Sequence, residues 1–231
     1  MSGNSGTSQV TTGATAPPCI GVLVSGRGSN LEAIFAAIGR GELHAHVGIV
    51  ISSKPDAPAL EIARTNQVPT QIIVPKEYTS RKAAGIALLA ALREAQVVLV
   101  VLAGYKPILD ADVVAAYPLR IINIHPSLLP AFAGGMAPRP QTEALAAGVK
   151  ITGCTVHFVT EAVDEGPIIA QAAVPVQDGD TVEDLSSRIL EMEHRIFPRV
   201  IEDVLYSTVR LEGRRVLLQP TSAHKTKASS Q

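Results

Sequence analysis

The chain has 231 residues, of which 46% are hydrophobic and 18% are charged, and its 20 Lys and Arg nearly balance its 21 Asp and Glu. Because nucleic acids and anionic membranes bind clustered cations, a near-neutral chain without a basic block in its body favours small molecules as the main partners. The longest apolar run, residues 97–103, is far shorter than the roughly 20 residues that a membrane-spanning helix needs.

The two ends of the chain differ in composition from its body. The first 18 residues are rich in Ser, Thr and Gly and have neither a positive start nor an apolar stretch, so they are unlike a secretory signal. We expect residues 1–18 to be a disordered tail, residues 19–213 to form one domain, and residues 214–231 to be a flexible tail. Cys19 and Cys154 lie beside strand-like apolar residues, and without an export signal we interpret both as reduced, buried thiols of a cytoplasmic protein.

Short β-branched runs alternate with amphipathic segments from residue 19 onward, which is typical of βα units on a mainly parallel sheet. These runs predict strands at residues 20–24, 47–51, 71–74, 97–103, 120–124, 153–159 and 168–174. The helical spacing of apolar residues predicts helices at residues 31–38, 60–64, 80–94 and 182–206. We therefore expect a single-domain α/β fold, Rossmann-like, in which a mainly parallel twisted sheet carries helices on both faces.

The segment SGRGSN, residues 25–30, lies between a predicted strand and a predicted helix. Free backbone N–H groups and the positive end of the helix favour an anion there, so we predict a phosphate site. A dinucleotide fingerprint would need a glycine where Leu31 stands and an acidic residue where Ser52 stands, which disfavours NAD. Two alternatives stay open: the glycines serve only a tight turn, or Ser29 and Asn30 are plain helix caps.

The segment NIHPSLLP places Asn123 and His125 on one face at the carboxyl end of a predicted strand, where open α/β sheets bind ligands. An amide donor beside an imidazole can hold a developing oxyanion, and a charged His does so more strongly or passes on a proton, which suits acyl transfer. Asp164 lies in the turn VDEGP, and beside that ring it would raise the pKa of His125 and keep it protonated. The alternative for each residue is a purely structural role.

Other polar residues carry weaker signals. The six His and two Cys never fall at metal-ligand spacing, so we expect no metal site. Glu193 and His194 lie in a predicted amphipathic helix, where charged residues normally face solvent. We interpret His157, which alternates with apolar residues in a predicted strand, as structural, and Arg81, at a helix start, as a surface charge.

Six motifs occur in one order along the chain: SGRGSNL, LAGYKPIL, NIHPSLLP, GCTVHFV, VDEGPI and EHRIFP. Through them the chain resembles the phosphoribosylglycinamide formyltransferase family between Ile20 and Leu205. The resemblance implies a formyltransferase fold and an enzyme of purine biosynthesis that needs no metal. In that reaction the amine of glycinamide ribonucleotide takes the formyl group of its co-substrate 10-formyltetrahydrofolate, which gives formylglycinamide ribonucleotide and tetrahydrofolate.

The resemblance also implies roles for single residues. Asn123 and a protonated His125 would steady the oxyanion, and Asp164 would sustain the charge of His125 and help to move a proton from the attacking amine through water. The residues that would bind the ribonucleotide are Gly28, Ser29 and Asn30 at its phosphate and Glu193 at its ribose hydroxyls, which revises the solvent-facing interpretation of Glu193. The residues that would bind the folate are Arg81 at its glutamate carboxylate and Lys106, Pro107, Ile108, Leu109, Ala162 and Val163 around the pterin ring.

The chain departs from this family at two places. Lys106-Pro107 stands where many relatives carry Met-Arg, and the proline removes one backbone N–H from the edge of the pterin pocket. The loop 131–143, AFAGGMAPRPQTE, lacks the histidines that are common there and is slightly longer. The part that this loop plays in substrate capture therefore stays open.

NIHPSLLP is shared with the wider formyltransferase group, so it identifies the chemistry better than the acceptor. The acceptor could be water, tRNA or a nucleotide sugar, although we expect the tRNA enzyme and the hydrolase to need an additional domain. Alternatively, the chain is a catalytically silent nucleotide-binding module that uses the glycine loop alone. The sequence also leaves open whether the protein is a monomer or a homodimer.

Overall fold

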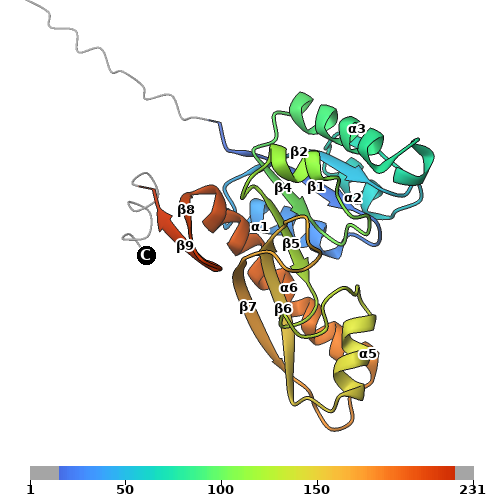
Figure 1. The fold of residues 1–231 in the computed structure, drawn as a ribbon, viewed down its shortest axis with the longest axis vertical. Helices are drawn as coiled ribbons and strands as arrows, with labels where there is room; N and C mark the ends of the chain where they lie inside the picture. The colour runs from blue at the N-terminus through green and yellow to red at the C-terminus, as the bar shows by residue number, and fades with distance from the viewer. Residues whose placement is uncertain (1–15, 222–231) are drawn as a thin grey trace, which may run out of the picture.

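The computed structural model describes residues 16–221, which fold around one seven-stranded sheet (Figure 1). The tails predicted at the two ends lie outside that range for residues 1–15 and 222–231. The strands lie in the order β3-β2-β1-β4-β5-β6-β7. Their bounds are β1 Cys19–Val24, β2 His46–Ser52, β3 Thr70–Ile72, β4 Leu99–Leu102, β5 Ile121–His125, β6 Ile151–Phe158 and β7 Ile168–Pro175. Strands β1 to β5 pair in parallel, whereas β6 is antiparallel to β5 and β7, so the predicted mainly parallel sheet is confirmed.

Helices cover both faces of this sheet, as predicted. They are α1 Ser29–Gly39, α2 Ala59–Thr65, α3 Arg81–Glu94, α4 Ala111–Ala116, α5 Arg139–Ala146 and α6 Val182–Leu205, with a 3₁₀ turn η1 at Pro75–Glu77. Successive side chains of β1 point to opposite faces: Val22 packs in the apolar cluster that includes α1 and α6, and Leu23 packs in the cluster that includes α3 and α4. This alternation gives the sheet a core on each side.

The order of the strands reverses at β1, because the chain runs outward from β1 to β2 and β3 and then returns to β4 on the other side. Open α/β sheets bind ligands in the crevice beyond the carboxyl ends of the strands at such a switch point. The Gly-rich loop 25–30 follows β1, the loop 103–109 follows β4, and His125 ends β5. The topology thus brings these three segments to one edge of the sheet.

The short helix α5 differs from the sequence prediction. It begins at Arg139, inside the segment 131–143 that the sequence analysis describes as a loop. Pro140 lies in its first turn, where a proline is tolerated because the N–H that it lacks would have no partner within the helix. A proline that reads as a loop signal is therefore part of a helix start.

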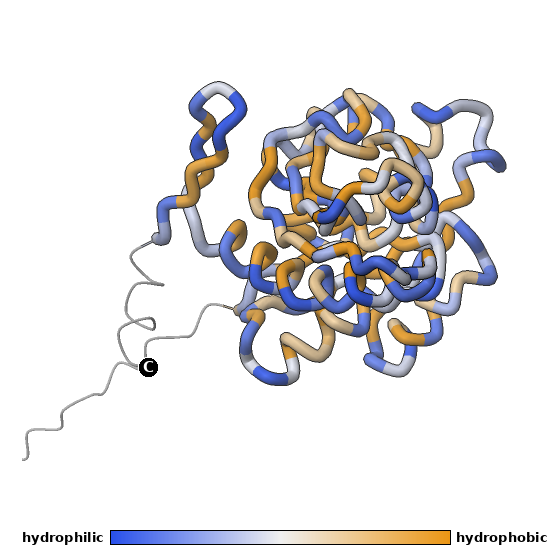
Figure 2. The backbone as a smooth tube through the Cα atoms, turned by 90° about the horizontal axis from the view of Figure 1, so that it is seen from below, coloured by the Kyte–Doolittle hydropathy of each residue, from blue (hydrophilic) through white to orange (hydrophobic). Residues whose placement is uncertain are grey.

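A β-hairpin follows the last helix. Strand β8 (Ser207–Glu212) pairs antiparallel with β9 (Arg215–Pro220), and Figure 2 shows this hairpin standing out from the body of the molecule. The prediction that residues 214–231 form a flexible tail is therefore wrong for residues 215–220. The physical reason is the tight turn at Gly213, whose φ of 59° suits glycine and lets the two strands share a full ladder of hydrogen bonds.

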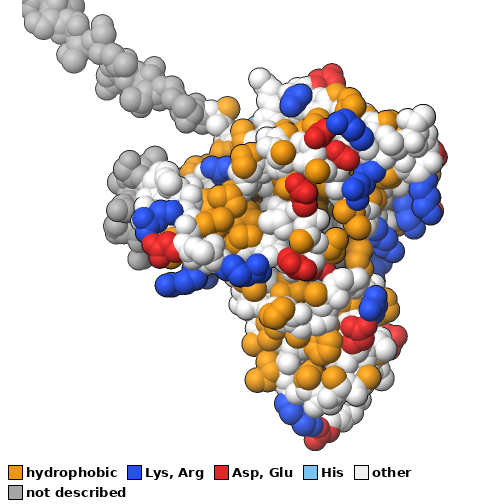
Figure 3. All heavy atoms as spheres, in the orientation of Figure 1, with side chains coloured by type: hydrophobic (Ala, Val, Ile, Leu, Met, Phe, Trp, Pro, Cys, Tyr) orange, Lys and Arg blue, Asp and Glu red, His pale blue; other side chains and the backbone are white. Residues whose placement is uncertain are grey.

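The charged side chains at the surface and the two cysteines lie as the composition and the sequence predict. Side chains of both charge signs are interspersed on the face drawn in Figure 3. Cys19 and Cys154 are free and buried, as predicted, and burial raises the pKa of Cys154 to about 12. Between residues 16 and 221, no helix is long and apolar enough to cross a membrane.

Candidate active site

A hollow of about 280 Å³ opens at the carboxyl ends of β4 and β5. Its walls come from the loop after β4, the end of β5, and the loop between β6 and β7. Nine of the residues singled out from the sequence line it: Asn123, His125, Asp164, Lys106, Pro107, Ile108, Leu109, Ala162 and Val163. The structure therefore brings together the residues predicted for catalysis and those predicted for the pterin ring.

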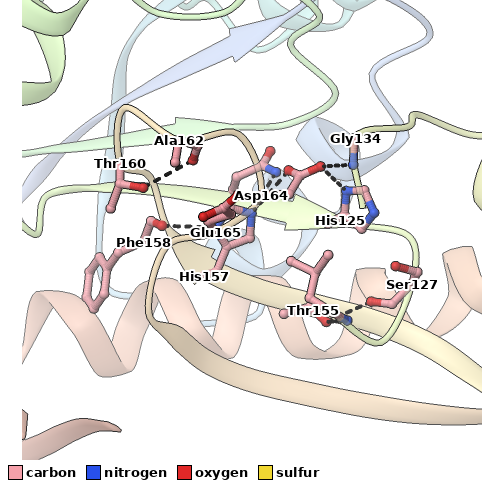
Figure 4. Close-up of polar contacts among 12 residues, drawn as sticks. His125, Ser127, Gly134, Thr155, His157, Phe158, Thr160, Ala162, Asp164 and Glu165 are labelled. Atoms are coloured by element: carbon pink, nitrogen blue, oxygen red, sulfur yellow. Dashed lines mark hydrogen bonds and ion pairs between the residues drawn. The ribbon is translucent and has the colours of Figure 1, made fainter. Parts of the chain in front are cut away.

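The imidazole of His125 lies between two loops (Figure 4). Its Nδ1 is 3.3 Å from Oδ2 of Asp164, and its Nε2 is 3.2 Å from the carbonyl oxygen of Phe132. The same Asp164 oxygen accepts a hydrogen bond of 2.8 Å from the backbone N–H of Gly134. One carboxylate thus connects the ring at the end of β5 to the loop 131–143.

Burial determines the direction in which the pKa of His125 shifts. The side chain is 3% exposed, and its burial lowers the pKa below the ordinary value of 6.5, although Asp164 and the Phe132 carbonyl each act to raise it. The prediction that Asp164 raises the pKa of His125 above its ordinary value is therefore wrong in this structure, because the imidazolium loses more hydration than one carboxylate at this distance restores. Both ring nitrogens nevertheless face oxygen acceptors, so a proton on either nitrogen finds a partner.

His157 takes part in the site, which the sequence interpretation of it as structural missed. The register of β5 and β6 sets Asn123 opposite His157, and the Nδ2 of Asn123 donates to the Nε2 of His157 at 3.1 Å. The Nδ1 of His157 donates to the carbonyl of Phe158 at 2.9 Å, and burial lowers the pKa of the ring, so both contacts suit the neutral form. The Nε2 of His157 also lies 3.7 Å from Oδ1 of Asp164. The sequence signal that could have identified His157 as part of the site is the antiparallel pairing of its strand with the strand of Asn123.

Two residues that contact His125 have an uncommon backbone conformation. Phe132 and Asp164 have φ angles of 56° and 57°, in the left-handed region that non-glycine residues seldom adopt. Such conformations persist where the surrounding structure holds them, and they concentrate at functional sites.

Gly166, two residues after Asp164, allows a close approach between the loop and β6. A Cβ at Gly166 would lie 1.7 Å from the carbonyl oxygen of Phe158, so only glycine permits this approach. The loop that presents Asp164 is fixed by that contact.

Replacement of Gly166 by Ala is expected to lower the free energy of unfolding by about 3 kcal/mol, because the methyl group would force the loop away from β6. Urea denaturation of the two proteins measures this difference. Gly179→Ala is the matched control, since a Cβ at Gly179 meets no heavy atom within 4 Å. Equal losses in the two variants would contradict the role assigned to the close approach.

The Gly-rich loop opens helix α1, as predicted. Gly28 is the N-cap with φ 89°, and a Cβ there would lie 2.7 Å from the Cβ of Ala59. No side chain caps the helix start, and Asn30 instead donates from Nδ2 to Oε2 of Glu193 at 2.8 Å. The plain-cap alternative for Ser29 and Asn30 therefore has no support in the structure, and the loop is joined to α6.

Glu193 faces inward from helix α6, where it is 6% exposed, so the solvent-facing interpretation of this residue is wrong. It lines a second hollow, of about 360 Å³, between the Gly-rich loop, α5 and α6. Burial raises the pKa of Glu193 to about 7, although the hydrogen bond from Asn30 acts to lower it. One loop contributes to both hollows, because residues 134–136 line the first hollow and residues 137–138 line the second.

Because the pKa of Glu193 rises from 4.5 unfolded to about 7 folded, the native state binds this proton more tightly, and stability is lost as pH rises from 4.5 through 7. Above that range, the shift corresponds to a loss of about 3 kcal/mol in the free energy of unfolding. Glu193→Gln removes the titration, so its stability relative to the wild type should grow between pH 5 and pH 8. Urea denaturation at both pH values tests this, with the exposed Glu191→Gln as the control that should follow the wild type. A constant difference at the two pH values would refute the assignment.

Arg81 does not line either hollow. Its side chain is 60% exposed and lies 3.9 Å from Oδ2 of Asp110, at a small recess that Ile108 and Leu109 also line. It is therefore placed next to the outer rim of the first hollow. Across the part of the chain that the structure describes, no three His, Cys, Asp or Glu side chains form a group that could hold a metal ion.

The chain is similar to known proteins along most of its length. The family described as formyl transferase matches residues 19–201. The chain is 41% identical over 184 residues to a phosphoribosylglycinamide formyltransferase of Bacillus subtilis, which covers 80% of this chain and 93% of the relative. It is similar to the crystal structure of glycinamide ribonucleotide transformylase 1 from Symbiobacterium toebii, with a TM-score of 0.84 and 48% identity over 94% of this chain and 100% of that one.

Some relatives are much longer proteins. The chain is 45% identical over 192 residues to the trifunctional purine biosynthetic protein adenosine-3 of Bos taurus. That match covers 83% of this chain but 19% of the relative. The chain therefore spans about a fifth of the length of these trifunctional relatives.

Proposed function

The chain belongs to the formyl transferase family, and we propose that it transfers the formyl group of 10-formyltetrahydrofolate to the amine of glycinamide ribonucleotide in purine biosynthesis. The products are formylglycinamide ribonucleotide and tetrahydrofolate. The observation that carries the proposal is the gathering of Asn123, His125 and Asp164 around one hollow, with Glu193 on the adjoining one. Relatives of similar length carry the name of this activity.

Asn123 and His125 act on the formyl oxygen in the proposed reaction. When the amine nitrogen bonds to the formyl carbon, negative charge develops on that oxygen, and the amide N–H of Asn123 and a ring N–H of His125 donate to it. Asp164 receives the proton of the amine through water, and the proton ends on the folate nitrogen as its bond to the formyl carbon breaks. The Nε2 of His125 contacts the Phe132 carbonyl at 3.2 Å, and the ring gives up this contact when it donates to the incoming oxygen.

At Lys106-Pro107 the wall of the first hollow has no free backbone N–H to offer the pterin ring. The backbone N–H of Lys106 already donates to the Oγ of Ser25 at 2.8 Å, and Pro107 has no N–H. The backbone groups left at these two positions to bind the donor-rich edge of the pterin ring are the carbonyl oxygens. Ile108, Leu109, Ala162 and Val163 supply the apolar walls that bind a flat ring.

The remaining predicted contacts lie at the second hollow for Glu193, and beside the hollows for Gly28, Ser29, Asn30 and Arg81. Gly28, Ser29 and Asn30 bind the phosphate at the start of α1, and the Glu193 carboxylate accepts from ribose hydroxyls. Arg81, exposed beside the rim of the first hollow, pairs with the glutamate carboxylate of the folate tail.

A mass-spectrometric product assay tests the proposed function. The purified protein is incubated with 10-formyltetrahydrofolate, with and without glycinamide ribonucleotide, and formylated ribonucleotide should form only in the complete mixture. Release of formate in both mixtures would show a hydrolase, and an intact folate in both would favour a silent nucleotide-binding module. The cytoplasmic location, the small-molecule partners and the choice between monomer and homodimer stay predictions.

A further inference from the structure

The hairpin of β8 and β9 is held to the body of the molecule at its base and along one face. At the base, the backbone N–H and the hydroxyl of Thr221 donate to the carbonyl of Tyr206 at 2.9 and 3.0 Å. Val209 and Val216 lie on one face of the hairpin and pack against the core cluster that includes α1 and α6. Because an isolated two-stranded hairpin is only marginally stable in water, these contacts give the hairpin a fixed place on the body.

The turn of this hairpin contacts the loop between β6 and β7 that carries Asp164, and residues 160–166 are called the Asp164 loop here. Arg214 follows Gly213 in the turn, and its Nη2 donates to the carbonyl of Glu165 at 2.8 Å. Strand β9 also lies beside β7, into which the Asp164 loop leads (Figure 1). The hairpin therefore connects the end of α6 to a loop of the first hollow.

Arg214 makes a contact with the Asp164 loop that no other residue between 16 and 221 makes. Within that range, one hydrogen bond joins the backbone of residues 160–166 to a residue outside the loop, and Arg214 donates it. The bond from the Gly134 N–H reaches the loop at the side chain of Asp164 instead. The position of the loop backbone therefore depends on the guanidinium of Arg214.

The peptide unit that Arg214 contacts lies directly after Asp164. Its oxygen is the Glu165 carbonyl, and its nitrogen belongs to Gly166, which packs closely against the carbonyl of Phe158. Because a peptide unit is planar, a contact on each side fixes its orientation. Asp164, one residue earlier, has a φ of 57°, a conformation that persists only where its surroundings hold it. The contact from Arg214 thus helps to set the direction of the Asp164 carboxylate.

We propose that Arg214 is a positioning residue, which holds the Asp164 loop from the C-terminal hairpin so that the Asp164 carboxylate stays beside the ring of His125. The inference rests on the proposed function for the catalytic part of Asp164. The match to the formyl transferase family ends at residue 201, before the hairpin begins. The hairpin is then a working part of the enzyme rather than a terminal appendage.

Steady-state kinetics of hairpin variants test this role. Arg214→Ala should lower kcat about fivefold, because Asp164 spends less time at His125. KM for glycinamide ribonucleotide should stay unchanged, since the Asp164 loop does not line the second hollow. Arg214→Lys should recover most of the loss, because an ammonium group can donate to the same carbonyl. The matched control is Arg215→Ala, which removes an exposed arginine without a hydrogen bond to residues 160–166 in the described chain and should match the wild type.

A double-mutant cycle shows whether Arg214 acts through Asp164. In an Asp164→Asn protein, adding Arg214→Ala should change kcat by less than about twofold, because no catalytic carboxylate is left to position. A fall of about fivefold in both backgrounds would overturn the inference, since a general structural effect is additive. A kcat of Arg214→Ala equal to that of the wild type would overturn it as well.

Hydrogen exchange followed by mass spectrometry separates this inference from the proposed function, because it needs no substrate. Arg214→Ala should speed exchange of the backbone amides in the Asp164 loop, and Arg215→Ala should not. If the wild type forms no product but exchange in the loop is faster in Arg214→Ala alone, the function fails and the contact from the hairpin stands. If the wild type forms formylated ribonucleotide and the loop exchanges equally in all three proteins, the inference is overturned and the function stands.

Discussion

Replacement of His125 by Ala is expected to lower kcat/KM for formyl transfer about 10³-fold, because it removes a donor aimed at the developing oxyanion and the partner of Asp164. Asn123 remains as the second donor, held by His157, so the loss should fall short of complete inactivation. The measurement is steady-state kinetics with both substrates varied.

A control must separate the loss of the His125 donor from a general loss of the fold. His46→Ala removes another histidine at an exposed place on β2, where the ring contacts the carbonyl of Pro17, and its kcat/KM should match the wild type. Circular dichroism should show the same secondary structure for both variants. A His125→Ala protein with kcat/KM within threefold of the wild type would remove this residue from the mechanism.

The strand ends could be predicted from the sequence because local chemistry determines them. A continuous apolar run followed by a Gly-rich loop marks the end of β1, and alternation places Asn123 and His125 on one face of β5. The rule that ligands bind at the carboxyl ends of such strands then locates the site. The first hollow follows from these local signals and from topology.

The features that local sequence patterns did not predict depend on contacts between distant segments. The helix pattern alone gives Glu193 as solvent-facing, and only the resemblance revised that interpretation; in the structure α6 packs this residue against Asn30, 163 positions away. His157 needs the antiparallel register of β6 to meet Asn123. The pKa of His125 depends on how much water the folded loops exclude, and no motif encodes that amount.

Asp164→Asn is expected to lower kcat/KM about 10²-fold, because the amide neither accepts the proton of the amine nor attracts a positive charge on His125. Asn tolerates the left-handed conformation that Asp164 adopts at φ 57°, so the loop should keep its shape. Since Asp164 acts to raise the pKa of His125, its neutralisation should lower that pKa still further below 6.5. The protonated fraction at any given pH falls with it, so a step that needs the imidazolium fades as pH rises through a lower value than in the wild type.

NMR titration of the His125 ring, together with kinetics, separates the two roles of Asp164. Glu165→Gln is the matched control, because it removes an exposed carboxylate from the next position and should leave both the pKa and the rate unchanged. A lower rate with an unchanged pKa would assign Asp164 to proton transfer alone. A lower pKa with an unchanged rate would show that the reaction proceeds through the neutral ring, which is the form that burial favours in this structure.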